Sequence, residues 1–234
     1  MSPKILLWDI ETSVNALDAH WAPIICIGYK WLGQKQVTVL STLDGPGKYY
    51  EDKNMIQKFR DILETADIEV THNGVLFDKP FLQSRLLYKE NSKGIPVKKR
   101  YLPQVASVDT YLSNRNKFRG SKKLDSLARF MGVKTTKTRL DVETWMKAQR
   151  GSKKAIGYLV EHCRRDVLVL EAVYKLTRPM MKGHPVVGLY GDCHSCGSRK
   201  MQKRGYSTTV LRGKQVRYQC QSCGGWCQRP ERKT

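Results

Sequence analysis

The sequence predicts an α/β domain with a mixed β-sheet and flanking helices, followed by a small cysteine-rich module. Three short apolar segments rich in β-branched residues open the chain and indicate strands. Segments with helical spacing then alternate with short strand-like segments, an order typical of α/β domains. Five of the seven cysteines fall in the last 42 residues, where the apolar content is too low to build a core unaided.

The domain is predicted to begin with an antiparallel meander. We expect strands over residues 4–10, 23–31 and 36–40, with a turn at Gly33 between the last two. Apolar residues at helical spacing then predict a helix over residues 54–65.

The remaining segments alternate between strands, helices and loops. We expect a strand over 68–71, a helix over 77–88, a loop over 89–103, a strand over 104–109, a helix over 124–131, a basic loop over 135–138 and a long amphipathic helix over 153–176. Pro179 ends the last helix, and a linker with glycines and a proline follows at residues 183–188. We therefore divide the chain into a core domain, residues 1–182, and a C-terminal module, residues 183–234.

The net charge is +21, from 42 Lys and Arg against 21 Asp and Glu, and it is unevenly distributed. Residues 1–88 carry −2, whereas residues 89–150 carry +11, residues 151–182 carry +4 and residues 183–234 carry +8. This charge favours a polyanionic partner, and nucleic acid is the expected one. A basic surface kept for solubility is the alternative, but so large a charge destabilises a small chain by self-repulsion.

No segment of the sequence is suited to a membrane or to export. No apolar run approaches the roughly 20 residues that span a bilayer. The apolar stretch of residues 5–8 ends at Asp9, too early for the core of a signal peptide. We therefore expect an intracellular protein, with the cytoplasm of a prokaryotic or phage-infected cell favoured.

Two acidic residues end the first predicted strand. Asp9 and Glu11 are two positions apart, so they share one face of the strand, opposite Ile10. Neighbouring carboxylates on a buried strand repel each other unless a cation neutralises them, and their oxygens suit Mg²⁺ or Mn²⁺. The alternative is a pair of solvated acids at an exposed strand end.

Two further segments carry acids suited to the same chemistry. Asp78 stands where a glycine-containing turn enters a predicted helix; an acid favoured by the helix dipole is the alternative reading. His162 and Asp166 are four residues apart on the long helix and share a face, with Tyr158 one turn before them. A purely structural histidine is the alternative there.

Taken in order, these segments resemble the three motifs of a known nuclease family. The sequences Asp9-Ile10-Glu11-Thr12, Asn73 to Asp78 and His162 to Asp166 are similar to the motifs of the DEDD superfamily of 3′–5′ exonucleases, the DnaQ-like branch of the ribonuclease H-like fold. The form of the second motif is most similar to the proofreading exonuclease domain of family B DNA polymerases. Residues 108–110 and 123–128 also resemble the DnaQ-type region between the second and third motifs. The resemblance covers about residues 4–178.

The resemblance implies a ribonuclease H-like mixed sheet and two-metal-ion hydrolysis of phosphodiester bonds. Carried over, it makes four acids the ligands of two Mg²⁺ or Mn²⁺ ions: Asp9, Glu11, Asp78 and Asp166. We also expect Asn73 and Phe77 to contact the nucleic acid.

The chain departs from the family at the general base. The family's tyrosine subgroup would place Tyr at position 162 and its histidine subgroup would place His at position 161, whereas this chain has Glu161 and His162. We favour His162, since it shares a helix face with Asp166. Glu161 would point about 100° away, and Tyr158 is the reserve candidate.

Two CxxC pairs predict a zinc site near the C-terminus. Cys193, Cys196, Cys220 and Cys223 would supply four thiolates to one structural Zn²⁺ ion, and each pair is followed by a glycine. Two strand-like segments, residues 207–211 and 215–220, lie between and beside them, so the module resembles a zinc ribbon. Cys227 and His194 are spare ligand types that we place outside the site, and free thiols are the alternative to metal.

Basic residues with interleaved aromatics decorate the ribbon and suit single-stranded nucleic acid. The basic residues are Arg199, Lys200, Lys203, Arg204, Arg212, Lys214 and Arg217, and the aromatics are Tyr206, Tyr218 and Trp226. The alternatives are that the aromatics form the ribbon's small core, or that the ribbon docks a replication or repair protein.

The sequence therefore predicts a stand-alone 3′–5′ exonuclease that acts on nucleic acid with a single-stranded 3′ end, with DNA favoured over RNA and the ribbon aiding substrate or partner binding. A structure-selective endonuclease on the same fold is one alternative. A non-catalytic nucleic-acid-binding protein is another.

Overall fold

The computed structural model of the protein describes residues 3–13, 18–19, 22–44, 51–117, 119–134, 140–181, 184–185, 192–194 and 197–230. The chain divides into two compact units, one formed by residues 4–174 and the other by residues from 175 onward. The division falls within the long helix α7 (Lys153–Thr177). The predicted boundary between residues 182 and 183, most of the predicted linker and the predicted loop at 135–138 lie outside the described residues.

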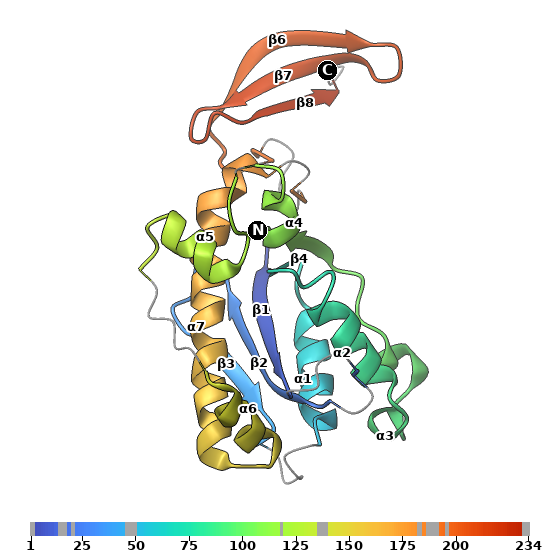
Figure 1. Cartoon of the computed structure of the whole chain (residues 1–234). Coiled ribbons are helices and arrows are strands. Elements are labelled where there is room, and N and C mark those ends of the chain that lie inside the picture. The colour runs from blue at the N-terminus through green and yellow to red at the C-terminus, as the bar shows by residue number, and fades with distance from the viewer. Residues whose placement is uncertain are drawn as a thin grey trace. The chain divides into compact units, whose positions relative to one another are not determined.

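The first unit is built on a five-stranded sheet in the order β3-β2-β1-β4-β5 (Figure 1). Its strands are β1 (Ile5–Thr12), β2 (Ile24–Trp31), β3 (Thr38–Ser41), β4 (Ile68–Thr71) and β5 (Ala106–Asp109). The pairs β1–β2 and β2–β3 are antiparallel, as expected of a meander, whereas β1–β4 and β4–β5 are parallel. The predicted mixed sheet is confirmed.

Helices cover both faces of this sheet, and the alternation of β1 decides which residues meet which helix. Leu6, Trp8 and Ile10 enter an apolar core with α1 (Lys53–Leu63) and α2 (Asp78–Leu87). On the opposite face β2 packs on α7 through Cys26 and Cys163. Because side chains alternate along a strand, Asp9 and Glu11 lie on the α7 face.

Several short elements depart from the sequence-based expectations. The predicted loop at 89–103 contains a short helix, α3 (Lys89–Ser92), and a 3₁₀ turn at Val97–Arg100. The helix α5 (Leu124–Phe130) was expected, but α4 (Thr110–Asn114) and α6 (Val142–Gln149) were not. Both unexpected helices begin at an aspartate that caps the first turn, a local signal too weak to predict a short helix without apolar periodicity.

The second unit contains an antiparallel three-stranded sheet in the order β6-β7-β8. The strands are β6 (Met201–Thr209), β7 (Gly213–Cys220) and β8 (Trp226–Pro230). The predicted strand at 215–220 lies within β7, whereas the one predicted at 207–211 overlaps β6 only at residues 207–209 and otherwise falls in the turn. The short strand β8 was not predicted. Of the helices that the structure describes, none is long and apolar enough to cross a membrane.

Candidate active site and metal centres

Strand β1 presents the first two candidate ligands to helix α7. Glu11 is buried and Asp9 is partly buried. The helix packs directly against this part of the strand, since the Cys163 Sγ atom lies 3.6 Å from the carbonyl oxygen of Asp9. Gly28 of β2, which pairs with Asp9, makes this approach possible. A Cβ atom at Gly28 would lie 2.8 Å from Cys163 Sγ, closer than real Cβ contacts allow.

Helix α7 brings His162 and Asp166 to the same place. The Nε2 atom of His162 lies 3.8 Å from Glu11 Oε1 and 3.7 Å from Asp166 Oδ2. One ligand atom from each of these three residues falls within 4.8 Å of the others. A glutamate on a strand and a histidine and an aspartate one helical turn apart thus form a compact set of metal-ligand types.

Asp78 supplies the fourth carboxylate from the start of α2. It is buried and accepts a hydrogen bond from the backbone N–H of Ile10 at 3.3 Å. Burial raises the pKa of Asp78 to about 7, and the charges of Asp109 and Glu69 act in the same direction against the hydrogen bond from Ile10. The ionised form of this carboxyl group is therefore unfavourable unless a nearby cation neutralises its charge.

The electrostatics of Asp9 indicate that this acid lies near the other three. Burial raises the pKa of Asp9 well above its ordinary value, and the charges of Asp78, Glu11 and Asp166 raise it further, in that order. Like charges raise one another's pKa only when they lie close together. The structure thus brings together all four sequence-predicted acids from three distant segments.

The turn that precedes Asp78 is held by a carboxylate from the end of β5. Asp109 accepts backbone N–H groups from Asn73 at 2.9 Å and Val75 at 3.0 Å. Asn73 has a φ of 66°, and a Cβ atom at Gly74 would lie 2.4 Å from the Thr71 side chain. This turn therefore requires a glycine at position 74 and a hydrogen-bond acceptor for its backbone N–H groups.

Asn73 and Phe77, the two predicted nucleic-acid contacts, flank this turn. Phe77 is 36% exposed and packs beside Phe81, with ring centroids 5.6 Å apart. Leu76 is 64% exposed, so the segment before Asp78 presents apolar surface next to the acids. Asn73 takes part through its backbone, which donates to Asp109.

The three candidates for the general base occupy different positions on α7. His162 lies between Glu11 and Asp166, with its side chain 12% exposed. Glu161 instead pairs with Arg165 at 2.9 Å and Arg164 at 3.4 Å on the exposed side of the helix. Tyr158 is half exposed. His162 therefore lies within the acid cluster, whereas Glu161 is engaged by arginines.

The acid cluster suits hard divalent cations. Carboxylate oxygens are the ligands that Mg²⁺ and Mn²⁺ prefer, and four acids converge here. The raised pKa values of Asp9 and Asp78 fit such a site, since a bound cation would neutralise carboxylates that otherwise repel each other.

In the second unit, matching backbone hydrogen bonds follow the first cysteine of each CxxC pair. Gly197 donates its N–H to the carbonyl of Cys193 at 2.8 Å, and Gly224 donates to the carbonyl of Cys220 at 2.9 Å. Both glycines have positive φ angles, 73° and 72°. Backbone N–H groups of Ser222 and Gly225 also lie 3.4 Å from the sulfurs of Cys220 and Cys223, respectively, an arrangement that favours thiolates.

The sulfur positions fit a tetrahedral zinc site. Cys193, Cys220 and Cys223 place their Sγ atoms within 4.8 Å of one another, and Cys193 and Cys223 are 3.6 Å apart. Zn–S bonds of about 2.3 Å in a tetrahedron require sulfurs about 3.8 Å apart. The predicted fourth ligand, Cys196, lies outside the described residues. Cys227 is buried nearby but is not among the three clustered sulfurs.

The predicted basic contacts of the ribbon lie on or beside its strands. Six of the seven are exposed and Arg217 is partly buried; the exposed ones are Arg199, Lys200, Lys203, Arg204, Arg212 and Lys214. Several stack on aromatics: Lys203 and Lys214 lie over Tyr206, and Arg217 lies over Trp226.

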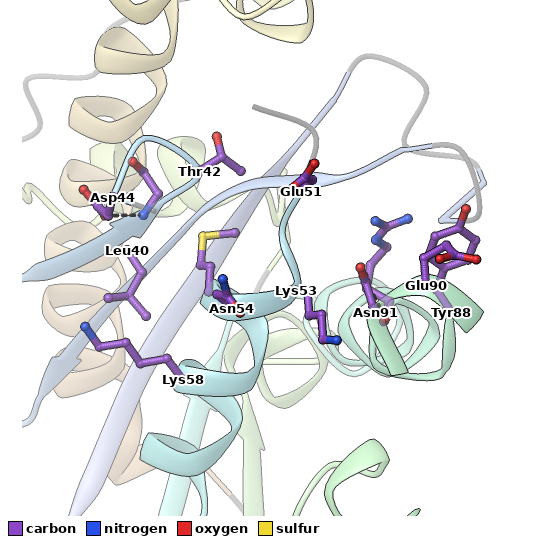
Figure 2. Close-up of a pocket in the computed structure, with 13 residues that line it drawn as sticks. Leu40, Thr42, Asp44, Glu51, Lys53, Asn54, Lys58, Tyr88, Glu90 and Asn91 are labelled. Carbon is purple, nitrogen blue, oxygen red and sulfur yellow. Dashed lines mark hydrogen bonds between the residues drawn. The ribbon is translucent and has the colours of Figure 1, made fainter. Parts of the chain in front are cut away.

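A separate cavity of about 500 Å³ lies between β3, α1 and the junction of α2 with α3 (Figure 2). Figure 2 shows Asn54 and Lys58 on one helix and Tyr88 and Asn91 on the other side. None of the predicted site residues lines it. Two of its lining residues, Arg85 and Asn91, donate hydrogen bonds of 2.8 Å to the buried Asp52.

Two residues that organise the acid cluster were not recognised from the sequence. Gly28 and Asp109 hold the backbone around the ligands without belonging to a ligand motif. An isolated glycine inside a strand is itself a signal of close backbone approach, and it could have identified Gly28. Asp109 stands in the segment that resembles the DnaQ-type region, but its role as an acceptor for four N–H groups emerges only in three dimensions.

Comparison with models of protein families gives a match that extends over most of the chain. A family model described as RNase_H superfamily matches residues 6–178. A search of curated proteins found no match.

Among solved structures the likenesses are partial. One exonuclease I structure has 12% identity and a TM-score of 0.46 over 76% of this chain and 41% of that one. Exonuclease I from Methylocaldum szegediense has 12% identity and a TM-score of 0.40 over 68% and 43%. A zinc-bound E. coli ExoI–ssDNA complex has 13% identity and a TM-score of 0.40 over 69% and 43%. The chain thus spans less than half the length of these proteins.

Proposed function

We propose that this chain, which belongs to the RNase H superfamily, is a two-metal-ion 3′–5′ exonuclease. The observation that carries the proposal is the convergence of Asp9, Glu11, Asp78 and Asp166 beside one histidine. A protein that only bound nucleic acid would gain nothing from four clustered acids, because they repel phosphate unless cations intervene.

The four acids would hold two Mg²⁺ or Mn²⁺ ions. Bound there, the ions would supply Lewis-acid polarisation of the scissile phosphate and charge stabilisation for hydrolysis. Two parts of the chain hold these ligands in position. The N–H of Ile10 orients Asp78, and the rigid α7 sets the spacing of His162 and Asp166.

His162 is the group we assign to the water. Its Nε2 atom faces the acid cluster, where a neutral imidazole can orient a water molecule and accept its proton. Glu161 is engaged by two arginines on the other side of the helix. We also assign to the turn at Asn73 and to the exposed Phe77 a contact with the terminal nucleotide, because both lie just before Asp78 in the chain.

The charge distribution supports a nucleic-acid path outside the acid cluster. Residues 89–150 carry +11 and residues 183–234 carry +8, whereas residues 1–88, which hold three of the four acids, carry −2. We infer that a single-stranded 3′ end, of DNA in preference to RNA, follows the basic segments to the acids. We also place the domain boundary at residues 182 and 183, and assign to the ribbon one structural Zn²⁺ and an auxiliary grip on the substrate or on a replication or repair protein.

Cleavage of end-labelled substrates tests this function. The purified chain is incubated with 5′- and 3′-labelled single- and double-stranded DNA and RNA, with Mg²⁺ or Mn²⁺. We expect mononucleotides released stepwise from the 3′ end of single-stranded DNA. Asp9→Asn and Asp166→Asn should each reduce the rate at least about 100-fold, the upper end of the loss seen for outer-shell partners of a metal. Glu161→Gln, on the same helix, is the matched control and should retain the rate.

Other outcomes identify the competing functions. Internal cuts on branched or looped substrates would indicate a structure-selective endonuclease. Binding without any cleavage in manganese would indicate a non-catalytic protein.

The base assignment has its own test. His162→Gln should reduce the rate by about 10²- to 10⁴-fold, as expected for loss of a general base. Tyr158→Phe should leave the rate unchanged. The reverse result would transfer the role to Tyr158.

A further inference from the structure

The ribbon strands carry positive charge with no acid among them. Residues 197–230 contain eight lysines and arginines and neither aspartate nor glutamate. The charge of this sheet cannot be neutralised by its own strands, so it is complementary to a polyanion.

A bulge in β6 gathers part of this charge around one aromatic ring. Lys203 pairs with Tyr218 and Tyr206 pairs with Val216, so three steps on β6 correspond to two on β7. Residues three apart on a regular strand would face opposite ways, but the irregularity at Gly205, with a φ of 90°, returns Tyr206 to the face of Lys203.

The result is a cluster of two ammonium groups on one exposed ring, which we call the Tyr206 cluster (Lys203, Tyr206 and Lys214). The Nζ atom of Lys203 lies 4.4 Å from the ring centroid and 2.6 Å from the hydroxyl. The Nζ atom of Lys214 lies 4.2 Å from the same centroid. The tyrosine is 44% exposed, so solvent reaches the side chain beside the two ammonium groups.

We propose that the Tyr206 cluster is a binding surface for unpaired nucleic acid. One base stacks on the Tyr206 ring, and the ammonium groups of Lys203 and Lys214 contact the phosphates on either side. A base displaces a lysine from the ring face, and that ammonium then moves to the adjacent phosphate. Because the faces of bases are accessible only in unpaired strands, the surface selects single strands over duplex. The inference rests on the proposed function for its biological setting, but binding itself is independent of catalysis.

The opposite face of the same sheet offers a matched control. Trp226 pairs with Gln219, the neighbour of Tyr218, so it faces away from the Tyr206 cluster. It is 52% exposed and carries one cation, Arg217, 4.7 Å from its ring centroid. The Tyr206 ring carries two cations and the Trp226 ring carries one. The Tyr206 face is therefore the better candidate for binding single-stranded nucleic acid.

Fluorescence anisotropy with a labelled 20-nucleotide oligo-dT and a duplex of equal length tests the proposal. The full-length chain carries Asp166→Asn in every sample, so the probe survives whether or not the wild-type chain is a nuclease. Tyr206→Leu should weaken oligo-dT binding about fivefold or more, within the range of loss of one stacked base. Tyr206→Phe and Trp226→Leu should each bind oligo-dT with an affinity within about twofold of that of the chain without these changes. The double variant Lys203→Gln/Lys214→Gln should reduce the steepness of the plot of log affinity against log salt concentration by about 1.4, as the loss of two phosphate contacts on a single strand requires.

Three results would overturn the inference. The first is an oligo-dT affinity that Tyr206→Leu leaves unchanged. The second is a loss of oligo-dT affinity in Trp226→Leu and not in Tyr206→Leu. The third is duplex binding as tight as single-strand binding. Zinc content of every variant is measured in parallel. If Tyr206→Leu loses zinc, the effect of the lysine double variant on the salt dependence decides the question, provided that this variant retains its zinc. Failure of the proposed nuclease function is visible separately, as absence of cleavage by the wild-type chain.

Discussion

Asp109 and Asn73, which belong to different strand–loop junctions, are joined by a hydrogen bond of 2.9 Å from the Asn73 backbone N–H to Asp109 Oδ1. The same carboxylate accepts N–H groups from Val75, Tyr111 and Leu112. It therefore caps α4 and at the same time holds the turn that leads to Asp78. The position of a buried candidate ligand depends on a side chain outside the cluster.

Asp109→Asn is expected to reduce nuclease activity by about 10- to 100-fold, the usual cost of losing an outer-shell partner at a metal site. The amide group offers one acceptor oxygen where the carboxylate offers two, so at least one N–H of the turn loses its partner. The Mg²⁺ concentration needed for half-maximal rate should rise as well. Kinetics at varied Mg²⁺ measure both effects.

Asp141→Asn is the matched control for this prediction. Asp141 caps α6 by accepting the N–H of Thr144 at 2.7 Å, so it holds a helix end as Asp109 does, but it is more than 60 residues from the turn before Asp78. Equal effects of the two variants would mean that Asp109 acts only as a helix cap.

Gly28→Ala is expected to displace α7 from the sheet. The new Cβ would meet Cys163 Sγ at 2.8 Å and Val167 Cγ2 at 3.1 Å, and overpacking of this kind costs about 1–3 kcal/mol of stability. Activity should fall too, since His162 and Asp166 move with the helix. Thermal unfolding and cleavage rate measure the two losses.

Adding Cys163→Ala should restore part of both losses in Gly28→Ala, because it removes the closest clashing atom. Gly157→Ala, at an open position of α7, should instead be neutral or stabilising. An unchanged melting temperature in Gly28→Ala would show that α7 tolerates displacement.

The stability of the chain without added Mg²⁺ or Mn²⁺ is expected to fall as pH rises from about 4 to about 7. The pKa of Asp78 is raised from 3.8 to about 7 in the folded protein, so between these values the folded state binds more protons than the unfolded state. Stability therefore decreases through this window and levels off above it. Calorimetry in buffers free of added divalent ions gives the slope.

Asp78→Asn should flatten that slope, because its side chain does not titrate. Addition of Mg²⁺ should restore stability of the unmodified chain most strongly at the alkaline end. A slope that Asp78→Asn leaves intact would assign the titration to another group, such as Asp9.

Cys220→Ser is expected to abolish zinc binding, whereas Cys227→Ser should retain one zinc ion per chain. Cys220 lies in the cluster of sulfurs and Cys227, though buried, does not. Thiolate loss leaves an incomplete tetrahedral set, and a module this small depends on its metal to fold. Elemental analysis of the purified variants measures the zinc directly. Zinc loss in Cys227→Ser alone would redefine the ligand set.

Local patterns in the sequence were sufficient to predict the main elements of the first unit. Alternation along β1 placed Asp9 and Glu11 on one face, and the spacing of four residues placed His162 beside Asp166. The strands of the mixed sheet followed from β-branched segments and the turn at Gly33, whose φ is 88°. Short elements such as α4, α6 and β8 escaped prediction because a single cap or turn carries too little local signal.

Tertiary structure alone decided which of these groups meet. Ile10 contacts Asp78 across 68 residues and Asp9 contacts Cys163 across 154 residues, separations that no local periodicity encodes. The sequence determined which residues carry acids, thiols and imidazole, and on which face of each element they lie. The packing of α7 over Gly28, the acceptor at Asp109 and the bulge at Gly205 decided their approach, because close contact depends on the volume left free by residues elsewhere in the chain.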